Sequence, residues 1–300
     1  MSRKVKDKSK TVCQSVPEYL LNVELRNSEE TYKFYAQYLR FICQFIGDLR
    51  IWELSREDID RMLSLKRQQN PKISNATLNK YIVTTKNLYK FITGRNLEYK
   101  KLKESRAVKE KIDGRIIKHI FEYLHERRYD KLIFRNYIFI RFLYDTGLRL
   151  NEITHIKVAD INLDGDYITV RETKSGHERI VVIHPETKIL LRQFLIATEH
   201  SHEYLFISYK KGKRLAKSSV HSMLKSLKEI LQLKININPH AWRHTFASNF
   251  LRDGGDMRTL QLLMGHTNYA TTEKYLHYDN EEIINSYKRV MKNKKLDFEF

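Results

Sequence analysis

The chain has 300 residues, enough for one large or two medium-sized domains, and 41% of them are hydrophobic, enough to build folded cores. Its 55 Lys and Arg residues outnumber 36 Asp and Glu residues, which gives a formal net charge of +19. This excess favours a polyanionic partner, either nucleic acid or an anionic membrane. Residues 1–110 and residues 111–300 share the excess almost equally, so both parts of the chain could contact that partner.

The sequence carries no signal for secretion or membrane insertion. Cys13 and Cys43 are too few for a disulfide framework, which fits a reducing cytoplasmic compartment. The basic start MSRKVKDKSK is not followed by the apolar segment of a signal peptide. Uncharged apolar runs stay well short of the roughly 18 residues of a membrane span. These features predict a cytoplasmic protein without a membrane partner, which leaves nucleic acid as the polyanion.

The N-terminal part is predicted to form a small all-helical domain at residues 16–93, behind a polar tail at residues 1–15. The first helix is expected at residues 16–25. Apolar residues then recur at helical spacing in three further segments. Each segment opens with start signals, which are Asn27 with Glu30, Ser55 with Asp58, and Pro71 with Asn75.

The fourth of these helices has one apolar and one polar face. The polar face carries three lysines, Lys80, Lys86 and Lys90, together with Asn79 and Asn87. Judged on these residues alone, such a face is more often solvated than engaged with a ligand.

Residues 94–112 lose the apolar periodicity and are mostly charged, so they are predicted to be an interdomain linker. The remaining residues, 113–300, are predicted to form a larger helical domain with one antiparallel hairpin. Its strands are expected at residues 167–171 and 179–183, with Ser175 and Gly176 in the turn. Helices are expected at about residues 114–127, 131–146, 149–156, 186–198, 217–232, 241–253, 256–263, 268–276 and 281–292. The predicted fold class is therefore mainly α with a small antiparallel β-sheet.

Four separated segments of this domain carry polar groups suited to phosphate chemistry. They are Arg149 in TGLRLNEI, Lys174 in ETKSGHE, His240 and Arg243 in HAWRHTF, and His266 with Tyr275 in LMGHTNYATTEKYLH. His240 and Arg243 are three residues apart, which places them on one helix face. Taken singly, each residue has an ordinary structural explanation as a surface, capping or ion-paired group.

Together these residue types match the needs of metal-free attack on a phosphodiester. Charge that develops on the non-bridging oxygens requires fixed cationic donors, and the planar fork of arginine suits two oxygens at once. A tyrosine can serve as the nucleophile and carry a phosphodiester-like intermediate. The leaving deoxyribose oxygen needs a proton, which a lysine on a turn can supply.

The ordered set TGLRLNEI, a turn lysine, HAWRHTFAS and LMGHTNYATTEKYLH resembles the tyrosine recombinase (phage integrase) family. The resemblance covers about residues 113–280, and the N-terminal helices are similar to the family's core-binding, SAM-like domain. It implies site-specific DNA recombination, by integration, excision or resolution, without metal or other cofactor.

The resemblance also implies roles for individual residues. Arg149 and Arg243 would grip the scissile phosphate, and His240 and His266 would assist by hydrogen bonding and proton management. Lys174 would protonate the leaving 5′ oxygen, with Lys157 as a distant rival for that role. Tyr275 would become linked to the 3′ phosphate, since Tyr269 and Tyr278 lack its Thr-Thr-x-x-Tyr context. Glu152 matches a supporting acidic position, and two apolar departures, Trp242 and Met264, leave the chemistry untouched.

The implied architecture is a two-domain clamp around double-stranded DNA that carries specific recombination sites. The face with Lys80, Lys86 and Lys90 would then meet DNA. The C-terminal helix at about residues 281–292 has an apolar stripe from Ile283 to Met291. The resemblance implies that this helix is exchanged between subunits of a homotetramer on two sites; the alternative is that it folds back on its own domain. The short N-terminal tail points to the simple class, similar to Xer-like chromosome-dimer resolvases or transposon resolvases. The place of action would be the nucleoid.

Two alternatives stay open on the sequence alone. A type IB topoisomerase uses a similar phosphotyrosine constellation but acts as a monomer without pairing DNA sites. A sequence-specific DNA-binding protein with a decayed site would keep the fold and lose the chemistry. The complete set of six expected catalytic residue types argues against the second alternative, and the apolar stripe after Tyr275 argues against the first.

Overall fold

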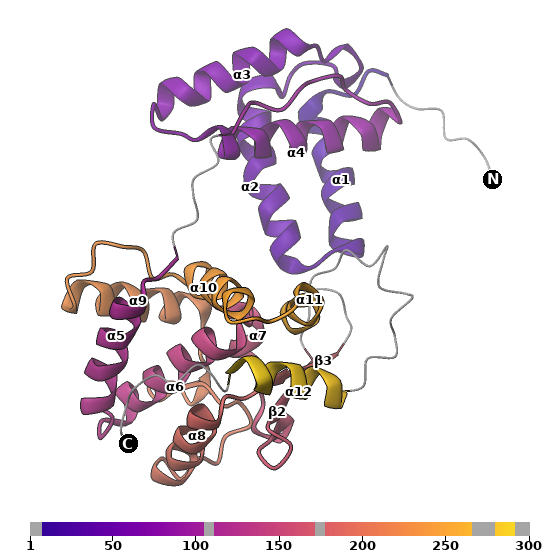
Figure 1. The fold of residues 1–300 in the computed structure, drawn as a ribbon. Helices are drawn as coiled ribbons and strands as arrows, with labels where there is room; N and C mark the ends of the chain where they lie inside the picture. The colour runs from indigo at the N-terminus through magenta and orange to yellow at the C-terminus, as the bar shows by residue number, and fades with distance from the viewer. Residues whose placement is uncertain (1–7, 105–110, 172–177, 266–279, 292–300) are drawn as a thin grey trace. The chain divides into compact units, whose positions relative to one another are not determined.

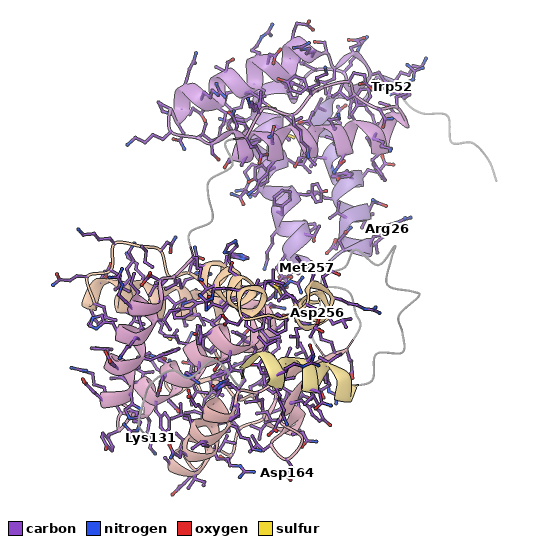
Figure 2. The ribbon with its side chains drawn as sticks, viewed as in Figure 1. Arg26, Trp52, Lys131, Asp164, Asp256 and Met257 are labelled. Carbon is purple, nitrogen blue, oxygen red and sulfur yellow. The ribbon has the colours of Figure 1, made fainter. Side chains whose placement is uncertain are left out.

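The chain divides into two compact units, Met1–Ala107 and Val108–Phe300, and helices dominate both (Figure 1). The computed structural model describes residues 8–104, 111–171, 178–265 and 280–291. Side chains from the helices meet in the interior of each unit, which has its own hydrophobic core (Figure 2). The predicted fold class, mainly α with a small antiparallel sheet, is confirmed.

In its described residues, 8–104, the N-terminal unit has four α-helices and one short 3-10 turn. Their bounds are Val12–Arg26 for α1, Glu29–Ile46 for α2, Ile51–Glu53 for η1, Arg56–Gln69 for α3 and Asn75–Thr93 for α4. The helix expected at residues 16–25 begins earlier, inside the segment predicted as a polar tail. The reason is that Thr11 forms a capping box with Gln14 and satisfies the first free N–H groups of α1.

Helix capping also explains where the next helices begin. The capping box predicted from Ser55 and Asp58 is confirmed at the start of α3. The predicted start of α2 is shifted, because Ser28 rather than Asn27 takes the cap position and accepts from the Thr31 N–H. Both caps supply an oxygen to backbone donors that have no partner inside the helix.

The first half of the expected linker packs on the N-terminal unit. Leu97 is buried, and Tyr99 and Leu102 pack against the same core. The Asn79 side chain accepts from the Leu102 N–H at 2.8 Å and donates to the Leu102 carbonyl at 2.9 Å, and Lys86 donates to the Tyr99 carbonyl at 3.1 Å. The polar face predicted on α4 is therefore covered in part by its own chain.

The second unit is built around the almost fully buried helix α6. Its α-helices are Gly114–Glu126 (α5), Lys131–Thr146 (α6), Leu150–Thr154 (α7), Pro185–Ala197 (α8), Lys217–Ile230 (α9), Pro239–Arg252 (α10), Met257–Met264 (α11) and Asn280–Met291 (α12). A 3-10 turn, η2, spans Val158–Asp160. The strands are Ile161–Asn162 (β1), Tyr167–Val170 (β2), Arg179–Val182 (β3), Ile207–Ser208 (β4) and Lys213–Arg214 (β5).

The small sheet has three strands in the order β1-β2-β3, all antiparallel. The predicted hairpin corresponds to β2 and β3, which pair Tyr167 with Val182 and Val170 with Arg179. The sequence did not predict β1 or the separate β4-β5 ribbon, because two-residue strands are too short for a visible alternation. The helix expected at residues 268–276 lies outside the described residues.

Helix α12 packs against its own domain. Ile283, Tyr287 and Val290 are buried in a cluster that takes side chains from β3, α10 and α11. The Tyr287 hydroxyl donates to the Asp145 carbonyl at 2.8 Å, and Lys288 forms a 2.6 Å ion pair with Asp166. The apolar stripe was predicted to dock on a neighbouring subunit, whereas in this single chain it covers the domain that carries it.

None of the helices in the described residues is both long enough and apolar enough to cross a membrane.

The docking of α12 predicts a stability effect for Tyr287, which is 1% exposed. Tyr287→Ala removes a buried ring and its hydrogen bond, so the free energy of unfolding should fall by about 3 kcal/mol. Tyr129→Ala is the matched control, because Tyr129 is 86% exposed and its loss should change stability by less than about 0.5 kcal/mol. Urea denaturation without DNA measures both. Equal midpoints for the two variants would contradict the docking.

Candidate active site

The TGLR segment turns sharply between α6 and α7 and presents Arg149 at the turn. Gly147 ends α6 with φ of 60°, and a Cβ there would lie 2.3 Å from the Phe246 ring, so only glycine fits. Thr146 donates its hydroxyl to the Phe142 carbonyl at 2.6 Å. Arg149 then adopts an extended backbone as the residue before α7. Its guanidinium enters the cluster described next, where it contacts Glu152 of α7 and the end of α11.

Glu152, in the first turn of α7, is the buried anion of this cluster. Its side chain is 2% exposed and accepts the Arg149 backbone N–H at 2.7 Å. The same carboxylate accepts from the Arg149 guanidinium, with 3.0 Å between Nη1 and Oε1. Glu152 thus fixes both the backbone and the side chain of Arg149.

A second arginine, Arg179 at the start of β3, holds the same carboxylate from the other side. Its Nη1 lies 3.0 Å from Oε1 of Glu152 and its Nη2 lies 2.9 Å from Oε2, the two-pronged geometry that arginine and carboxylate favour. Its Nε donates to the Leu263 carbonyl at 3.1 Å. Sequence reasoning assigned Arg179 only to a strand. The signal available was the need of a buried Glu152 for more positive charge than Arg149 alone provides.

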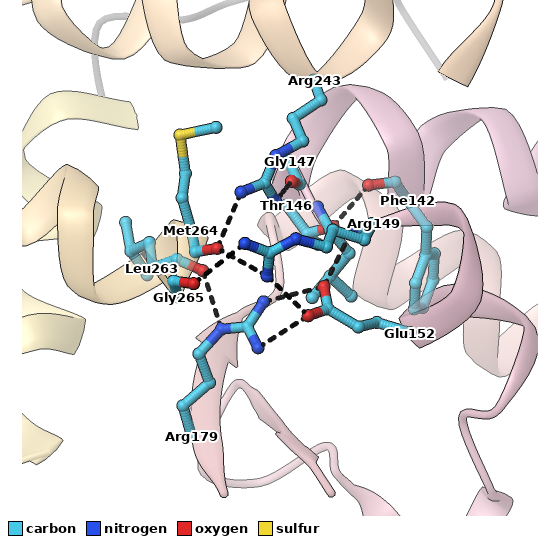
Figure 3. A network of polar contacts seen from close by, with 11 residues as sticks. Phe142, Thr146, Gly147, Arg149, Glu152, Arg179, Arg243, Leu263, Met264 and Gly265 are labelled. Atoms are coloured by element: carbon cyan, nitrogen blue, oxygen red, sulfur yellow. Dashed lines mark hydrogen bonds and ion pairs between the residues drawn. The ribbon is translucent and has the colours of Figure 1, made fainter. Parts of the chain in front are cut away.

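A third arginine, Arg243 on α10, also belongs to the cluster and lies next to Gly147 (Figure 3). Its guanidinium donates to the Gly147 carbonyl at 2.5 Å and to the Met264 carbonyl at 2.8 Å. Burial and the positive charge of Arg149 lower the pKa of Arg243 to about 10, although Glu152 opposes the shift. Arg243 therefore stays protonated near neutral pH.

The C-terminal end of α11 closes the cluster. Arg149 donates to the Met264 carbonyl at 3.3 Å and to the Gly265 carbonyl at 3.0 Å. These carbonyls belong to the last turn of a helix, where they lack partners within the helix and carry the negative end of its dipole. Figure 3 shows the guanidinium groups of Arg149, Arg179 and Arg243 pointing toward this helix end. Gly265 has φ of 61°, and a Cβ there would lie 2.9 Å from the Arg179 guanidinium carbon.

The electrostatics of the cluster favour an ionised Glu152 and leave an excess of positive charge. Burial would raise the pKa of Glu152, but the hydrogen bonds and charge of Arg179, joined by those of Arg149, hold it below its ordinary value. Three guanidinium groups thus surround one carboxylate and a row of carbonyl oxygens. Because 31% of the Arg149 side chain is exposed, an anion that approaches from solvent can contact this positively charged group.

The structure brings together two of the six predicted catalytic residues, since Arg149 and Arg243 donate to the same Met264 carbonyl. His240 is exposed in the first turn of α10, and the described contacts of the cluster do not include it. Lys174, His266 and Tyr275 lie outside the described residues. The rival lysine, Lys157, is engaged elsewhere in a 2.8 Å ion pair with Glu203.

Comparison with known proteins decides the family. Residues 110–282 match the phage integrase family, and residues 18–96 match the N-terminal SAM-like domain of phage integrases. The chain belongs to the phage integrase family. The sequence-based prediction of a site-specific tyrosine recombinase, an enzyme that breaks and rejoins DNA, is therefore confirmed.

Relatives of this integrase-family chain align along most of its length. Tyrosine recombinase XerA of Saccharolobus solfataricus is 32% identical over 283 residues, covering 87% of each chain. Tyrosine recombinase XerC of Staphylococcus saprophyticus is 28% identical over 283 residues, covering 90% of this chain and 93% of that protein. These relatives favour a recombinase over the topoisomerase and the silent DNA-binding protein.

Solved structures of similar fold span both units of the chain. The integrase of transposon Tn1549, solved in complex with circular intermediate DNA, has a TM-score of 0.72 at 20% identity and covers 93% of this chain and 99% of that one. XerH recombinase bound to its difH substrate has a TM-score of 0.70 at 18% identity, with 95% and 97% covered. At these identities the likeness concerns the fold.

The recombinase should depend on Glu152 for stability in a pH-dependent way. Glu152→Gln removes the anion from between the arginines, so the free energy of unfolding should fall by about 3 kcal/mol near pH 7. Because the pKa of Glu152 is depressed in the fold, its ionised form stabilises the protein above the ordinary value of 4.5. That contribution is lost as pH falls through the depressed pKa, so the difference between variant and wild type should narrow in acid.

Urea denaturation in steps from about pH 7 to about pH 3 measures this difference from above the ordinary glutamate pKa down into the range where the folded protein protonates Glu152. Glu229→Gln is the control, since Glu229 is 65% exposed and its ion pair among the described residues is with the surface Lys225, and it should match the wild type at every pH. A difference in the free energy of unfolding between wild type and Glu152→Gln that stays constant with pH would contradict an ionised Glu152.

Proposed function

We propose that the chain cuts and rejoins DNA by metal-free transesterification, with Arg149 and Arg243 as the grip on the scissile phosphate. The observation that carries the proposal is the cluster in which Glu152 and the end of α11 hold these two arginines side by side. A phosphodiester that gains negative charge in the transition state is stabilised by donors already fixed in place. An arginine pair of this kind supplies positive charge that compensates the negative charge of the transition state, and it does so without rearranging during the reaction.

The arginines keep N–H groups for a substrate. A guanidinium has five N–H donors. The contacts of the described residues use three of them on Arg149 and two on Arg243. The remaining donors have no hydrogen-bond partner among the described residues, so they can bind the non-bridging oxygens of a phosphate. Because Arg149 is partly exposed, these donors are also within reach of DNA.

The proposed chemistry assigns roles to residues outside the described part on the strength of their sequence motifs. The Tyr275 hydroxyl gives up its proton to His240 or His266, and its oxygen forms a bond to the scissile phosphorus while the bond from phosphorus to the 5′ oxygen breaks. Lys174 gives its proton to that leaving oxygen, and His240 and His266 hydrogen-bond the phosphate and manage protons. Rejoining is the reverse reaction, in which a 5′ hydroxyl attacks the 3′-phosphotyrosyl bond. Neither metal nor organic cofactor takes part.

The proposed substrate is double-stranded DNA with specific recombination sites, bound by both units as a clamp. The match of residues 18–96 to the SAM-like domain supports DNA contact by the N-terminal unit. On α4, Lys80 and Lys90 are exposed and remain candidates for phosphate contacts. Lys86 is only partly exposed and already donates to Tyr99, so it is the weakest of the three. The proposed place of action is the DNA of the nucleoid.

The covalent step is tested by trapping the protein–DNA adduct on a nicked duplex. A duplex selected by the wild-type protein from a randomised pool, then nicked near the cleavage position, should give a protein–DNA adduct in EDTA. Tyr275→Phe should bind this duplex and form no adduct, because it lacks the attacking oxygen. Tyr278→Phe is the control and should form adduct as the wild type does. An adduct in Tyr275→Phe, or a strict need for Mg²⁺, would contradict the mechanism.

The proposed active assembly is a homotetramer on two DNA sites, linked by exchange of α12. The socket that α12 fills in its own domain can accept the same helix from a neighbour, which is how identical elements are swapped between subunits. Exchange would preserve the buried contacts of Ile283, Tyr287 and Val290 and only change which chain donates them. Assembly and catalysis would then be coupled, because α12 follows the Tyr275 segment directly.

Light scattering on the selected duplex measures this assembly. The full-length chain should form a particle of four proteins on two duplexes. Deletion of residues 281–300 should abolish that particle, because the exchanged contacts are gone, while binding to one duplex remains at a temperature where the truncated chain is still folded. Because the deletion uncovers the socket of α12, it should also lower the midpoint of urea denaturation without DNA. A deletion variant that still pairs duplexes would contradict exchange, and a full-length chain that never pairs them would favour the topoisomerase alternative.

A further inference from the structure

Arg179 differs from the two other arginines of the cluster in its surroundings. Its side chain is 12% exposed, compared with 31% for Arg149. Each of its three guanidinium nitrogens has a partner, two on Glu152 and one on the Leu263 carbonyl. Arg179 therefore faces inward, toward the groups that hold Arg149, and not toward an incoming phosphate.

We propose that Arg179 is a positioning residue for the recombinase reaction, which acts through Glu152 to hold Arg149 in its phosphate-binding orientation. The proposal rests on the role assigned to Arg149 under the proposed function. It adds a residue on β3 to a site otherwise drawn from α7, α10 and α11. It also gives a reason for the arginine at this strand position, where a surface strand would accept many residues.

The division of hydrogen bonds on Glu152 explains how Arg179 acts. Oε1 accepts from Nη1 of Arg149 and from Nη1 of Arg179, and Oε2 accepts from the Arg149 backbone and from Nη2 of Arg179. Arg179 supplies half of these bonds. Without it, one charged partner would remain for a carboxylate that is 2% exposed, and burial would favour the protonated form. A protonated Glu152 holds Arg149 less firmly.

Among the described residues, the other charged groups near Glu152 do not replace Arg179. Arg243 on α10 adds positive charge from a distance, but its hydrogen bonds go to the Gly147 and Met264 carbonyls. On the far side of α7, Arg214 donates to the Thr154 hydroxyl and lies beside His155. The α11 end offers only carbonyl acceptors, which compete for the arginines and cannot donate to Glu152. Loss of Arg179 should therefore mainly affect the Glu152 carboxylate, which loses two hydrogen bonds and one neighbouring positive charge.

This mechanism predicts a pH dependence that a merely structural role would not produce. In Arg179→Gln the pKa of Glu152 should rise, so Glu152 becomes protonated as pH falls and Arg149 loses its anchor. Cleavage should be slowed about tenfold or more at the acid end and come within about threefold of wild type at the alkaline end. A purely structural defect would lower the rate by the same factor at every pH.

The experiment is single-turnover cleavage of the selected, nicked duplex at saturating protein, from about pH 5 to about pH 9, a span that covers a raised carboxyl pKa. The ratio of variant to wild-type rate removes the titration of groups common to both. Arg171→Gln is the matched control, because Arg171 also loses two carboxylate partners, Asp160 and Glu178, at the other strand of the hairpin. Its rate ratio should not change with pH.

Two more variants separate charge from geometry. Arg179→Lys keeps the positive charge but not the two-pronged contact, so its rate should fall severalfold without the new acid dependence. Glu152→Gln imitates the protonated carboxyl and should be slow at every pH. Adding Arg179→Gln to Glu152→Gln should then bring no further pH dependence, since the titrating group is gone.

The outcomes distinguish this inference from the proposed function. If the wild type forms no adduct with the duplex, the proposed function fails first. If the wild type cleaves and the Arg179→Gln ratio is flat with pH, the positioning role of Arg179 is wrong. The role is also wrong if the double variant keeps the acid dependence of Arg179→Gln, because Glu152 would then not be the group that titrates.

Discussion

The buried carboxylate of Glu152 is the interaction on which the site depends. Three arginines in one small volume repel each other, and the structure holds them together by placing one anion between two of them. The cost of burying that anion is offset by four hydrogen bonds and two positive charges. Glu152 also accepts a hydrogen bond from the backbone N–H of Arg149, just before α7. A single side chain therefore fixes both the backbone of Arg149 and the orientation of its guanidinium.

The last carbonyls of α11 are the second negative partner of the arginines. Leu263, Met264 and Gly265 offer oxygens that a helix end leaves free, and each arginine takes at least one. The arrangement fastens α11 to the arginines, and α11 also packs beside α12 in a shared apolar cluster. The tyrosyl segment follows Gly265 directly in sequence. The position of Gly265, the last described residue before Tyr275 in the sequence, is therefore set by the groups proposed to bind phosphate.

Sequence patterns predicted what is local and repetitive. Helix periodicity and the Ser55–Asp58 capping box needed only neighbouring residues, and the TGLR and HxxR motifs picked out the arginine pair that the fold brings together. Long-range pairings were missed. Arg179 looked like an ordinary strand residue because its partner Glu152 lies 27 positions away. Residues 97–104 looked like a charged linker because the Asn79 contacts that fasten them cannot be read from composition.

The central claim is that Glu152 is ionised and shared between Arg149 and Arg179. A ¹³C NMR titration of the Glu152 side-chain carboxyl in the DNA-free protein, assigned by comparison with Glu152→Gln, tests it most directly. If the two arginines hold Glu152 ionised, its pKa lies below the ordinary glutamate value of 4.5. A pKa at or above that value would show that burial outweighs the arginines, and would contradict the account.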